Sequence, residues 1–209
     1  MFKPILTFSA AVLLCACATA PLDRTAAVQP VHKKVDFFAA GHTQAAFKIV
    51  GTMNDNGVEG VLVAKKLEAD SYEITVLTTG AYRLLHATVT PQGIAYRYLY
   101  PAADTAWVRG RISQFLNLLL LDPGTYKRTR REKEQTTVFY KNSDASVRLF
   151  YAPEQEYPFA AQTSTWSNKA RLAYAEYAPA DAQGEIQVPH ELVYQDGKIE
   201  LALTLIRLK

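Results

Sequence analysis

Cysteine is almost absent from this chain: both of its cysteines, Cys15 and Cys17, lie within the first 17 of 209 residues. A disulfide framework and a cysteine-based metal site are therefore excluded for the rest of the chain. No apolar run approaches the roughly 20 residues that a membrane-spanning helix needs. The net charge is only +3, whereas nucleic-acid-binding domains usually carry a strong basic excess, so we expect no nucleic-acid partner.

Motifs for catalysis and for metal or nucleotide binding are also missing. None of the four histidines has a partner at the spacing of an H-E-x-x-H zinc site, and neither a G-x-S-x-G elbow nor a glycine-rich nucleotide loop occurs. A thiol nucleophile is excluded beyond residue 17. We therefore expect no catalytic residue, no metal and no cofactor. Two carboxylates that only the fold brings together would leave no sequence signature, so an enzyme stays open as a third function class.

The composition indicates a folded domain. Hydrophobic residues make up 49% of the chain and charged residues 21%, which is enough apolar material for a core and excludes disorder by composition. The length fits one domain. We divide the chain into residues 1–16 as a signal peptide, 17–32 as a tether and 33–209 as the domain.

The first 20 residues have the layout of a secretory signal. Lys3 supplies a positive charge, an apolar run extends from Ile5 to Leu14, and small residues follow. Such a segment can be removed by ordinary cleavage, here before Thr19, or it can stay uncleaved, and both alternatives stay open.

The end of this segment, Leu14-Cys15-Ala16-Cys17, resembles the bacterial lipobox. In that family, the cysteine after a small residue is acylated, for example with palmitate, and becomes the first mature residue. The resemblance implies lipidation of Cys17. Cys15 fits less well because Leu14 would stand where a small residue is wanted.

The resemblance to bacterial lipoproteins also implies a location. Ala18 follows the lipidated cysteine, instead of the Asp that retains many such proteins at the inner membrane. An anchor in the outer membrane, on its periplasmic side, is therefore expected. Several acyl chains make such an anchor stable, and the charge-poor residues 17–32 have the composition of a tether.

Most of the chain from residue 45 onward alternates apolar and polar residues with the period of a half-buried strand. The clearest cases are Ser71–Thr78, Ile94–Tyr100, Val147–Tyr151 and Ile199–Leu205. The second of them is expected to place its three tyrosines on one face. Turn sequences such as Asn54–Gly57, Pro91–Gly93 and Asp196–Gly197 fall between strands and predict antiparallel hairpins.

Asp104–Leu121 breaks this pattern, because its apolar residues recur near helical spacing. The sequence predicts a helix here with Asp104 as its N-cap and with Asp122-Pro123-Gly124 as its end. The run Leu118–Leu121 is apolar on all sides and needs cover from protein or lipid. A second, shorter helix is expected at Val31–Ala40.

This order of elements resembles the LolA/LolB family of periplasmic lipoprotein carriers and outer-membrane lipoprotein receptors. The resemblance covers about residues 31–209 and is clearest over Tyr72–Leu121. It implies a mainly β (α+β) fold: an incomplete antiparallel β-barrel, or half-barrel, of about 9–11 strands capped by an apolar helical lid. It also implies a cavity between sheet and lid that accepts acyl chains.

The residues expected to line the cavity come from the predicted strands and from the predicted helix: Tyr72, Ile74, Tyr96, Tyr98, Trp107, Ile112, Leu116, Leu119 and Leu203. The same aromatic side chains could instead fill a core. The family's receptor carries a protruding apolar residue, usually Leu, in a loop that corresponds here to Thr78-Thr79-Gly80-Ala81, and the resemblance implies a membrane-facing role for Thr79, Gly80 and Tyr82. Thr79 occupies about that position and the nearest apolar candidate is Tyr82, so a paralogue with a different lipidic ligand stays an alternative.

Two functions from different classes are consistent with these features. The first is a monomeric, LolB-like lipoprotein that binds acyl chains or a lipoprotein and serves lipid or lipoprotein transport. The second is an accessory envelope lipoprotein with a filled core and a protein partner. The basic run Lys127–Lys133 also has two interpretations: contact with lipid phosphates or an acidic partner, or an edge strand whose charge discourages edge pairing.

Overall fold

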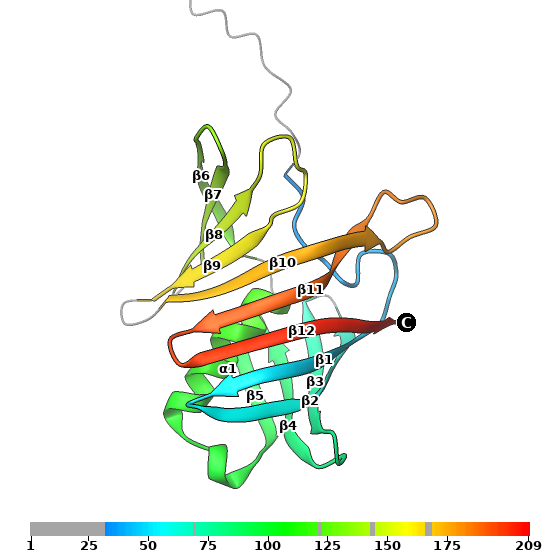
Figure 1. Cartoon of the computed structure of the whole chain (residues 1–209), viewed down its shortest axis with the longest axis vertical. Helices are drawn as coiled ribbons and strands as arrows, with labels where there is room; N and C mark the ends of the chain where they lie inside the picture. The colour runs from blue at the N-terminus through cyan, green and yellow to red at the C-terminus, as the bar shows by residue number, and fades with distance from the viewer. Residues whose placement is uncertain (1–31, 69, 121–122, 143–144, 166–168) are drawn as a thin grey trace, which may run out of the picture.

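The computed structural model describes residues 32–68, 70–120, 123–142, 145–165 and 169–209. Within these residues, twelve strands pair into one antiparallel sheet, and one α-helix, α1 (Ala106–Leu120), lies against a face of that sheet (Figure 1). A 3-10 turn, η1 (Pro101–Ala103), precedes the helix. The strands are β1 (Gln44–Met53), β2 (Asn56–Glu68), β3 (Ser71–Thr78), β4 (Arg83–Thr90), β5 (Gly93–Leu99), β6 (Thr125–Arg131), β7 (Thr136–Lys141), β8 (Ser146–Tyr151), β9 (Ala160–Ser164), β10 (Lys169–Pro179), β11 (Gln187–Asp196) and β12 (Ile199–Leu208).

The sheet is open. Its order is β5-β4-β3-β2-β1-β12-β11-β10-β9-β8-β7-β6, so β5 and β6 are edge strands at opposite ends. The first strand pairs with the last, with Phe47 of β1 facing Leu205 of β12. The expected mainly β, incomplete antiparallel barrel is confirmed. The strand number was underestimated, because β7 and β9 are short and their sequences, TTVFYK and AAQTS, show little alternation.

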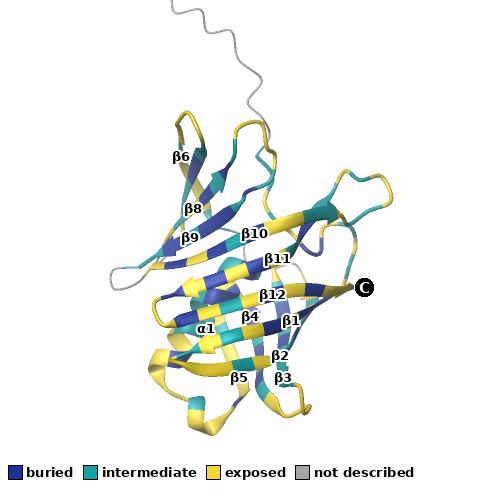
Figure 2. Ribbon diagram, in the orientation of Figure 1, coloured by how far each residue is buried: buried dark blue, intermediate teal, exposed yellow. Residues whose placement is uncertain are grey.

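Burial alternates along most strands, as Figure 2 shows. We call the face that carries α1 the inner face and the opposite one the outer face. Tyr72 and Ile74 of β3, Leu149 of β8 and Leu203 of β12 are all buried. The alternation predicted for these three strands is confirmed. Burial of apolar side chains against the core is favourable in free energy, so these side chains turn to the side of the strand where the core lies.

The expectation that the tyrosines of β5 share one face is wrong. The β4–β5 register shifts between His86 and Ala87, so that Tyr96 lies opposite the buried Ala87 while Tyr98 lies opposite His86. Such a β-bulge adds one residue to a strand and reverses the faces beyond it. Tyr98 consequently moves to the outer face, and Leu99 becomes buried.

The helix α1 is confirmed, but its N-cap is not Asp104. The Oγ1 atom of Thr105 accepts a hydrogen bond from the backbone N–H of Val108 at 3.2 Å, which is the role of an N-cap side chain. The carboxylate of Asp104 instead binds Arg109, whose Nε and Nη2 atoms donate to it at 2.6 and 2.9 Å. Among the described residues, no helix has both the length and the hydropathy needed to span a membrane.

The short helix expected at Val31–Ala40 is also wrong: the described residues 32–40 contain only a turn at 37–40. The carboxylate of Asp36 accepts the backbone N–H of Phe38 at 2.8 Å. Both phenylalanines are buried, Phe37 against Phe47 and Phe38 against Tyr72, each with ring centroids 5.1 Å apart. The turn thus buries two consecutive aromatic rings against two different strands, β1 and β3.

Candidate functional site

An apolar cavity of about 400 Å³ lies between α1 and the half of the sheet formed by β1–β5 and β12. Among its lining residues, only Glu59, Thr78 and Tyr100 carry polar side-chain groups. The rest of the wall is apolar or glycine: Ile49, Met53, Gly57, Val58, Leu62, Val76, Leu84, Leu85, Leu99, Ala103, Val108, Ile112, Phe115, Leu116 and Leu201. The volume falls in the range of small-ligand sites, roughly 300–1,000 Å³. A wall with so few polar groups suits a hydrocarbon chain better than a polar ligand.

Contacts with β11 and with β5 hold α1 over the sheet. Phe115 packs edge-on against Tyr194 of β11, with ring centroids 5.0 Å apart. Arg111 is ion-paired with Asp196 at the end of the same strand. These contacts fix the helix over β11, and the hydroxyl of Tyr96 of β5 donates to the carbonyl of Arg109 in α1 at 3.0 Å. The apolar cavity remains between the helix and the inner side of β2–β5.

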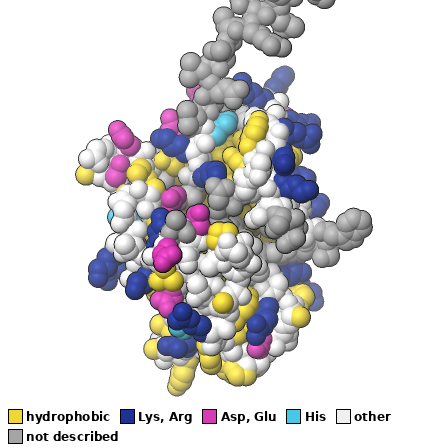
Figure 3. All heavy atoms as spheres, turned by 180° about the vertical axis from the view of Figure 1, so that it is seen from behind, with side chains coloured by type: hydrophobic (Ala, Val, Ile, Leu, Met, Phe, Trp, Pro, Cys, Tyr) yellow, Lys and Arg dark blue, Asp and Glu magenta, His cyan; other side chains and the backbone are white. Residues whose placement is uncertain are grey.

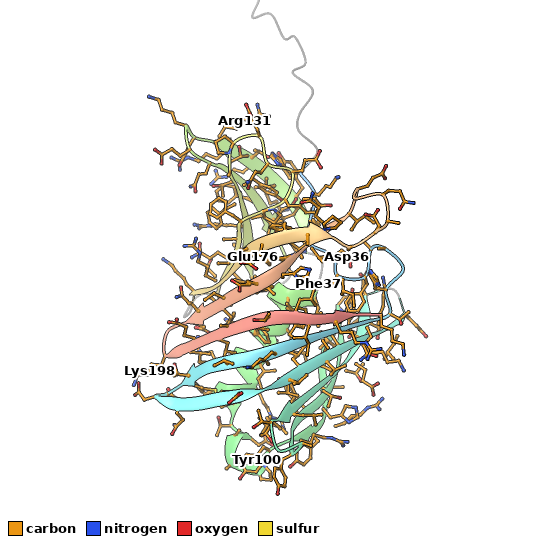
Figure 4. All side chains as sticks on the ribbon, turned by 45° about the vertical axis from the view of Figure 1, so that its right-hand side comes forward. Asp36, Phe37, Tyr100, Arg131, Glu176 and Lys198 are labelled. Atoms are coloured by element: carbon orange, nitrogen blue, oxygen red, sulfur yellow. The ribbon has the colours of Figure 1, made fainter. Side chains whose placement is uncertain are left out.

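An aromatic rim adjoins the cavity. We use this name for Tyr82, Tyr98 and Tyr100, which line a second hollow. This hollow shares Thr78, Leu84 and Tyr100 with the cavity wall. The side chains of Tyr82 and Tyr100 are 76% and 49% exposed. Figure 4 places Tyr100 at the lower end of the molecule, where Figure 3 shows hydrophobic side chains on the surface.

The loop between β3 and β4, in which a membrane-facing segment was expected, lies at this rim. The backbone N–H of Tyr82 donates to Thr78 Oγ1 at 3.1 Å, and the backbone N–H of Thr78 donates to the carbonyl of Tyr82 at 2.9 Å. These bonds close the loop and leave Thr79 and Gly80 exposed at its tip. Tyr82, the nearest apolar candidate, is the most exposed member of the rim.

Of the nine expected cavity residues, Ile112 and Leu116 line the cavity. Tyr72 and Leu119 line a smaller hollow of about 180 Å³ at the other end of the helix, beside Phe37.

The other five expected residues lie elsewhere. Ile74 and Leu203 are packed in the core. Tyr96 donates a hydrogen bond to the carbonyl of Arg109 at 3.0 Å. Tyr98 belongs to the rim, and Trp107 is 41% exposed beneath the guanidinium of Arg111, at 5.2 Å.

Several wall residues were not expected from the sequence. Ile49 of β1 and Leu62 of β2 lie on strands whose alternation also indicates an inner face. Phe115 lies on the helix, and Leu99 reaches the cavity only because of the bulge in β5. The alternation could have identified Ile49 and Leu62, whereas no feature of the local sequence predicts the bulge in β5.

The opposite flank of α1 faces a different space. Ser113, Gln114 and Asn117 line a cavity of about 220 Å³ together with Thr163 of β9 and Lys34. The lining of this second cavity is mixed, since it also includes Val35, Leu118, Val147 and Leu149. The helix therefore separates a mixed cavity over β8–β9 from the apolar cavity over β1–β5. Among the described residues, no group of three or more histidines, cysteines or carboxylates could hold a metal ion.

Comparison with solved structures identifies the fold. A LolA superfamily protein from Nitrosomonas europaea superimposes with a TM-score of 0.58 over 82% of this chain and 87% of its own, at 10% sequence identity. The chain has a LolA-like fold. The resemblance proposed from the sequence is thus confirmed at the level of the fold.

Two further structures are similar at lower scores. A putative outer membrane lipoprotein-sorting protein domain from Vibrio parahaemolyticus gives a TM-score of 0.46 at 9% identity, over 80% of this chain and 84% of its own. A DUF1329 family protein from Desulfovibrio piger gives 0.47 at 8% identity, over 83% and 87%. No family model and no curated protein sequence matches the chain. At such low identity, the LolA-like fold is established by backbone geometry alone.

Proposed function

We propose that this protein is a lipid-anchored envelope lipoprotein that binds the acyl chain of a lipid or lipoprotein in the apolar cavity beneath α1. The observation that carries the proposal is the cavity itself: about 400 Å³, with three polar side chains among its lining residues. Each methylene that leaves water contributes roughly 0.8 kcal/mol. Binding would therefore be driven by burial of hydrocarbon and would involve no bond making, which makes the proposed role that of a carrier or receptor and not of an enzyme.

Two features support a route for the ligand. The aromatic rim borders the cavity, and its tyrosines combine an apolar ring with a polar hydroxyl, the type of side chain favoured where hydrocarbon meets water. The mixed cavity on the other flank of α1, with Lys34 and Gln114 in its wall, offers polar groups that the apolar cavity lacks. An amphiphile could therefore keep its acyl chain under the helix and its head outside the apolar space.

The proposed location is the periplasmic side of the outer membrane. Its support is the lipobox-like sequence ending at Cys17, followed by Ala18. The described domain would then act as a monomer beside a source of acyl chains.

The test is lipid loading of residues 18–209, which contain every described strand and α1. Native mass spectrometry of this chain purified from bacterial cells should detect a bound lipid, and the chain should take up a fluorescent fatty acid such as parinaric acid. Ile112→Trp places a larger ring in the cavity wall and should reduce uptake at least tenfold. Leu118→Trp is the matched control, since Leu118 lies on the same helix but lines the mixed cavity on its other flank.

The control should load like the wild type, and thermal unfolding should show that both variants fold. Absence of lipid and of fatty-acid uptake in the folded wild type would overturn the proposal in favour of an accessory lipoprotein with a protein partner. Equal loss of uptake in both tryptophan variants would remove the apolar cavity as the site.

A further inference from the structure

A row of arginines crosses the outer face of the sheet. The strand register places Arg128 of β6 opposite Phe139 of β7, and Phe139 opposite Arg148 of β8. Gln162 of β9 stands between Arg148 and Arg171 of β10. Strands lie about 4.8 Å apart, so neighbouring arginines of the row attach to the backbone at intervals of roughly 10 Å.

A second row runs beside the first, two residues along each strand. Lys141 of β7 faces Ser146 of β8, and Lys169 of β10 faces Ser164 of β9. Side chains two residues apart share a face of a strand, so these lysines lie on the same side as the arginines. We call the five cations of the two rows the basic face: Arg128, Lys141, Arg148, Lys169 and Arg171.

The basic face is exposed and lies away from the cavity. Arg148 and Arg171 are exposed, while their neighbours Leu149 and Leu172 are buried on the inner side. Viewed from behind, Figure 3 shows Lys and Arg side chains gathered along the edge formed by β6 and β7. Figure 4 places Arg131 of β6 at the opposite end of the molecule from Tyr100 of the rim.

Carboxylates are scarce within the strands that carry this face. The strands β6, β7, β8 and β9 contain no Asp or Glu, and β10 contains one, Glu176. By contrast, the strands of the other half of the sheet carry Glu59 on β2, Glu191 on β11 and Glu200 on β12. Edge protection alone would explain cations on β6, but not a row that continues to β10 in the interior of the sheet.

An aromatic ring is part of the row. The guanidinium groups of Arg128 and Arg148 lie 4.7 and 5.5 Å from the ring centroid of Phe139. Stacking on the ring leaves the edge of each planar guanidinium available for two parallel hydrogen bonds to a phosphate. Several such sites spread over five strands match an extended anionic surface better than one small anion.

The beginning of the described chain lies at this half of the sheet, on its inner side, where Tyr151 is buried with Leu149. The ring of His32 packs on Tyr151 of β8 with centroids 4.4 Å apart, and the hydroxyl of Tyr151 donates to the carbonyl of Lys33 at 3.2 Å. Burial, followed by the nearby charge of Arg131, lowers the pKa of His32. Fourteen residues lie between Cys17 and His32, and the chain from one to the other spans at most about 50 Å.

We propose that the basic face docks the domain onto the anionic phospholipid headgroups of the membrane in which Cys17 is anchored. Arg128, Arg148 and Arg171 bind lipid phosphates, and Lys141 and Lys169 add attraction to the negative surface. Docking through this face keeps the aromatic rim, at the other end of the molecule, accessible to cargo. The proposal uses the anchor of the proposed function but does not depend on the cavity.

The experiment measures binding of residues 18–209, which lack the lipidated cysteine, to vesicles of phosphatidylcholine with or without 30 mol% phosphatidylglycerol. The wild type should cosediment only with the anionic vesicles, and 0.5 M NaCl should release it because salt screens surface charge. Replacing Arg128, Arg148 and Arg171 by Gln should weaken binding roughly 100-fold, since each basic residue at an anionic surface contributes about fivefold.

The matched control replaces Lys65, Lys198 and Arg207 by Gln, which removes the same charge from the other half of the sheet and should weaken binding less than tenfold. Equal binding of the wild type to both kinds of vesicle, no binding to either, or equal loss in the two triple variants would each overturn the proposal. Fatty-acid uptake separates the two proposals: the arginine variant should load like the wild type, and Ile112→Trp should still bind anionic vesicles.

Discussion

Arg111 of α1 forms an ion pair with the fully buried carboxylate of Asp196, the last residue of β11. The same carboxylate accepts a hydrogen bond from the hydroxyl of Tyr194 at 3.0 Å. Burial and the neighbouring carboxylate raise the pKa of Tyr194, so its hydroxyl stays protonated as a donor. One strand end therefore holds the helix through a charge and an aromatic contact at the side of the cavity.

Asp196→Asn should lower the free energy of unfolding by about 3 kcal/mol, because it leaves the partly buried Arg111 without its counter-charge. Asp104→Asn is the control, since the Asp104–Arg109 pair also involves α1 but is exposed, and such pairs contribute less than about 1 kcal/mol. Urea unfolding measures both. Equal losses would show that the buried pair does not hold the helix.

Gly110→Ala should stabilise the protein. Gly110 lies in α1, and a Cβ atom added there would meet open space. Alanine is favoured over glycine inside a helix by about 1 kcal/mol, which corresponds to roughly 2–4 °C in Tm for a domain of this size. A lower Tm in differential scanning calorimetry would mean that this helix face is covered in solution.

Gly60→Ala should have the opposite effect. A Cβ atom on Gly60 of β2 would collide with the backbone carbonyl of Leu77 in β3. The strands would have to separate at the cavity wall, at a cost of about 1–3 kcal/mol. The measurement is the urea midpoint, and an unchanged midpoint would contradict the close approach of these strands.

Stability should fall above pH 10. Burial, with the nearby carboxylates of Asp36 and Asp70, raises the pKa of Tyr72 from 10.0 to about 12. The unfolded chain therefore loses this proton first. The contribution of Tyr72 is complete below pH 10 and is lost as the pH rises toward 12, by up to about 2–3 kcal/mol at 1.4 kcal/mol per pKa unit.

Urea unfolding of Tyr72→Phe at pH 8 and pH 11.5 tests this effect, with Tyr82→Phe as the control for loss of a hydroxyl from an exposed ring. The wild type should lose more stability between the two pH values than Tyr72→Phe does. If both lose the same amount, Tyr72 is not a source of the alkaline decline.

Cys17 should carry the anchor, as the lipobox-like sequence predicts. Cells grown with an alkyne fatty acid should label the full-length wild type and not Cys17→Ser, whereas Cys15→Ser should retain the label. Labelling of Cys17→Ser at the wild-type level would remove this residue as the site. An unlabelled wild type would remove the lipoprotein prediction altogether.

The sequence alone determined where most elements lie and which side of each strand is buried. Alternation in β3, β8 and β12 indicates which side of each strand faces the core, because one face of a pleated strand packs on the core and the other contacts water. The Asn54–Gly57 turn was predictable for a local reason as well: Asn54 and Asp55 adopt positive φ angles that asparagine and aspartate tolerate. The length of α1 followed from its own apolar spacing.

Only the tertiary structure decided how these elements meet. The first described strand, β1, pairs with the last, β12. The bulge in β5 moves Tyr98 outward and Leu99 inward. Arg111 forms its ion pair with Asp196, which lies 85 residues further along the chain. Alternation shows that a side chain faces inward, but not whether a helix or an empty space lies beyond it. Packing between distant segments decides which inward side chains line a cavity and which fill the core. Strand register decides that Arg128, Arg148 and Arg171 lie in one row. Neither follows from the sequence, because both depend on contacts that local sequence does not encode.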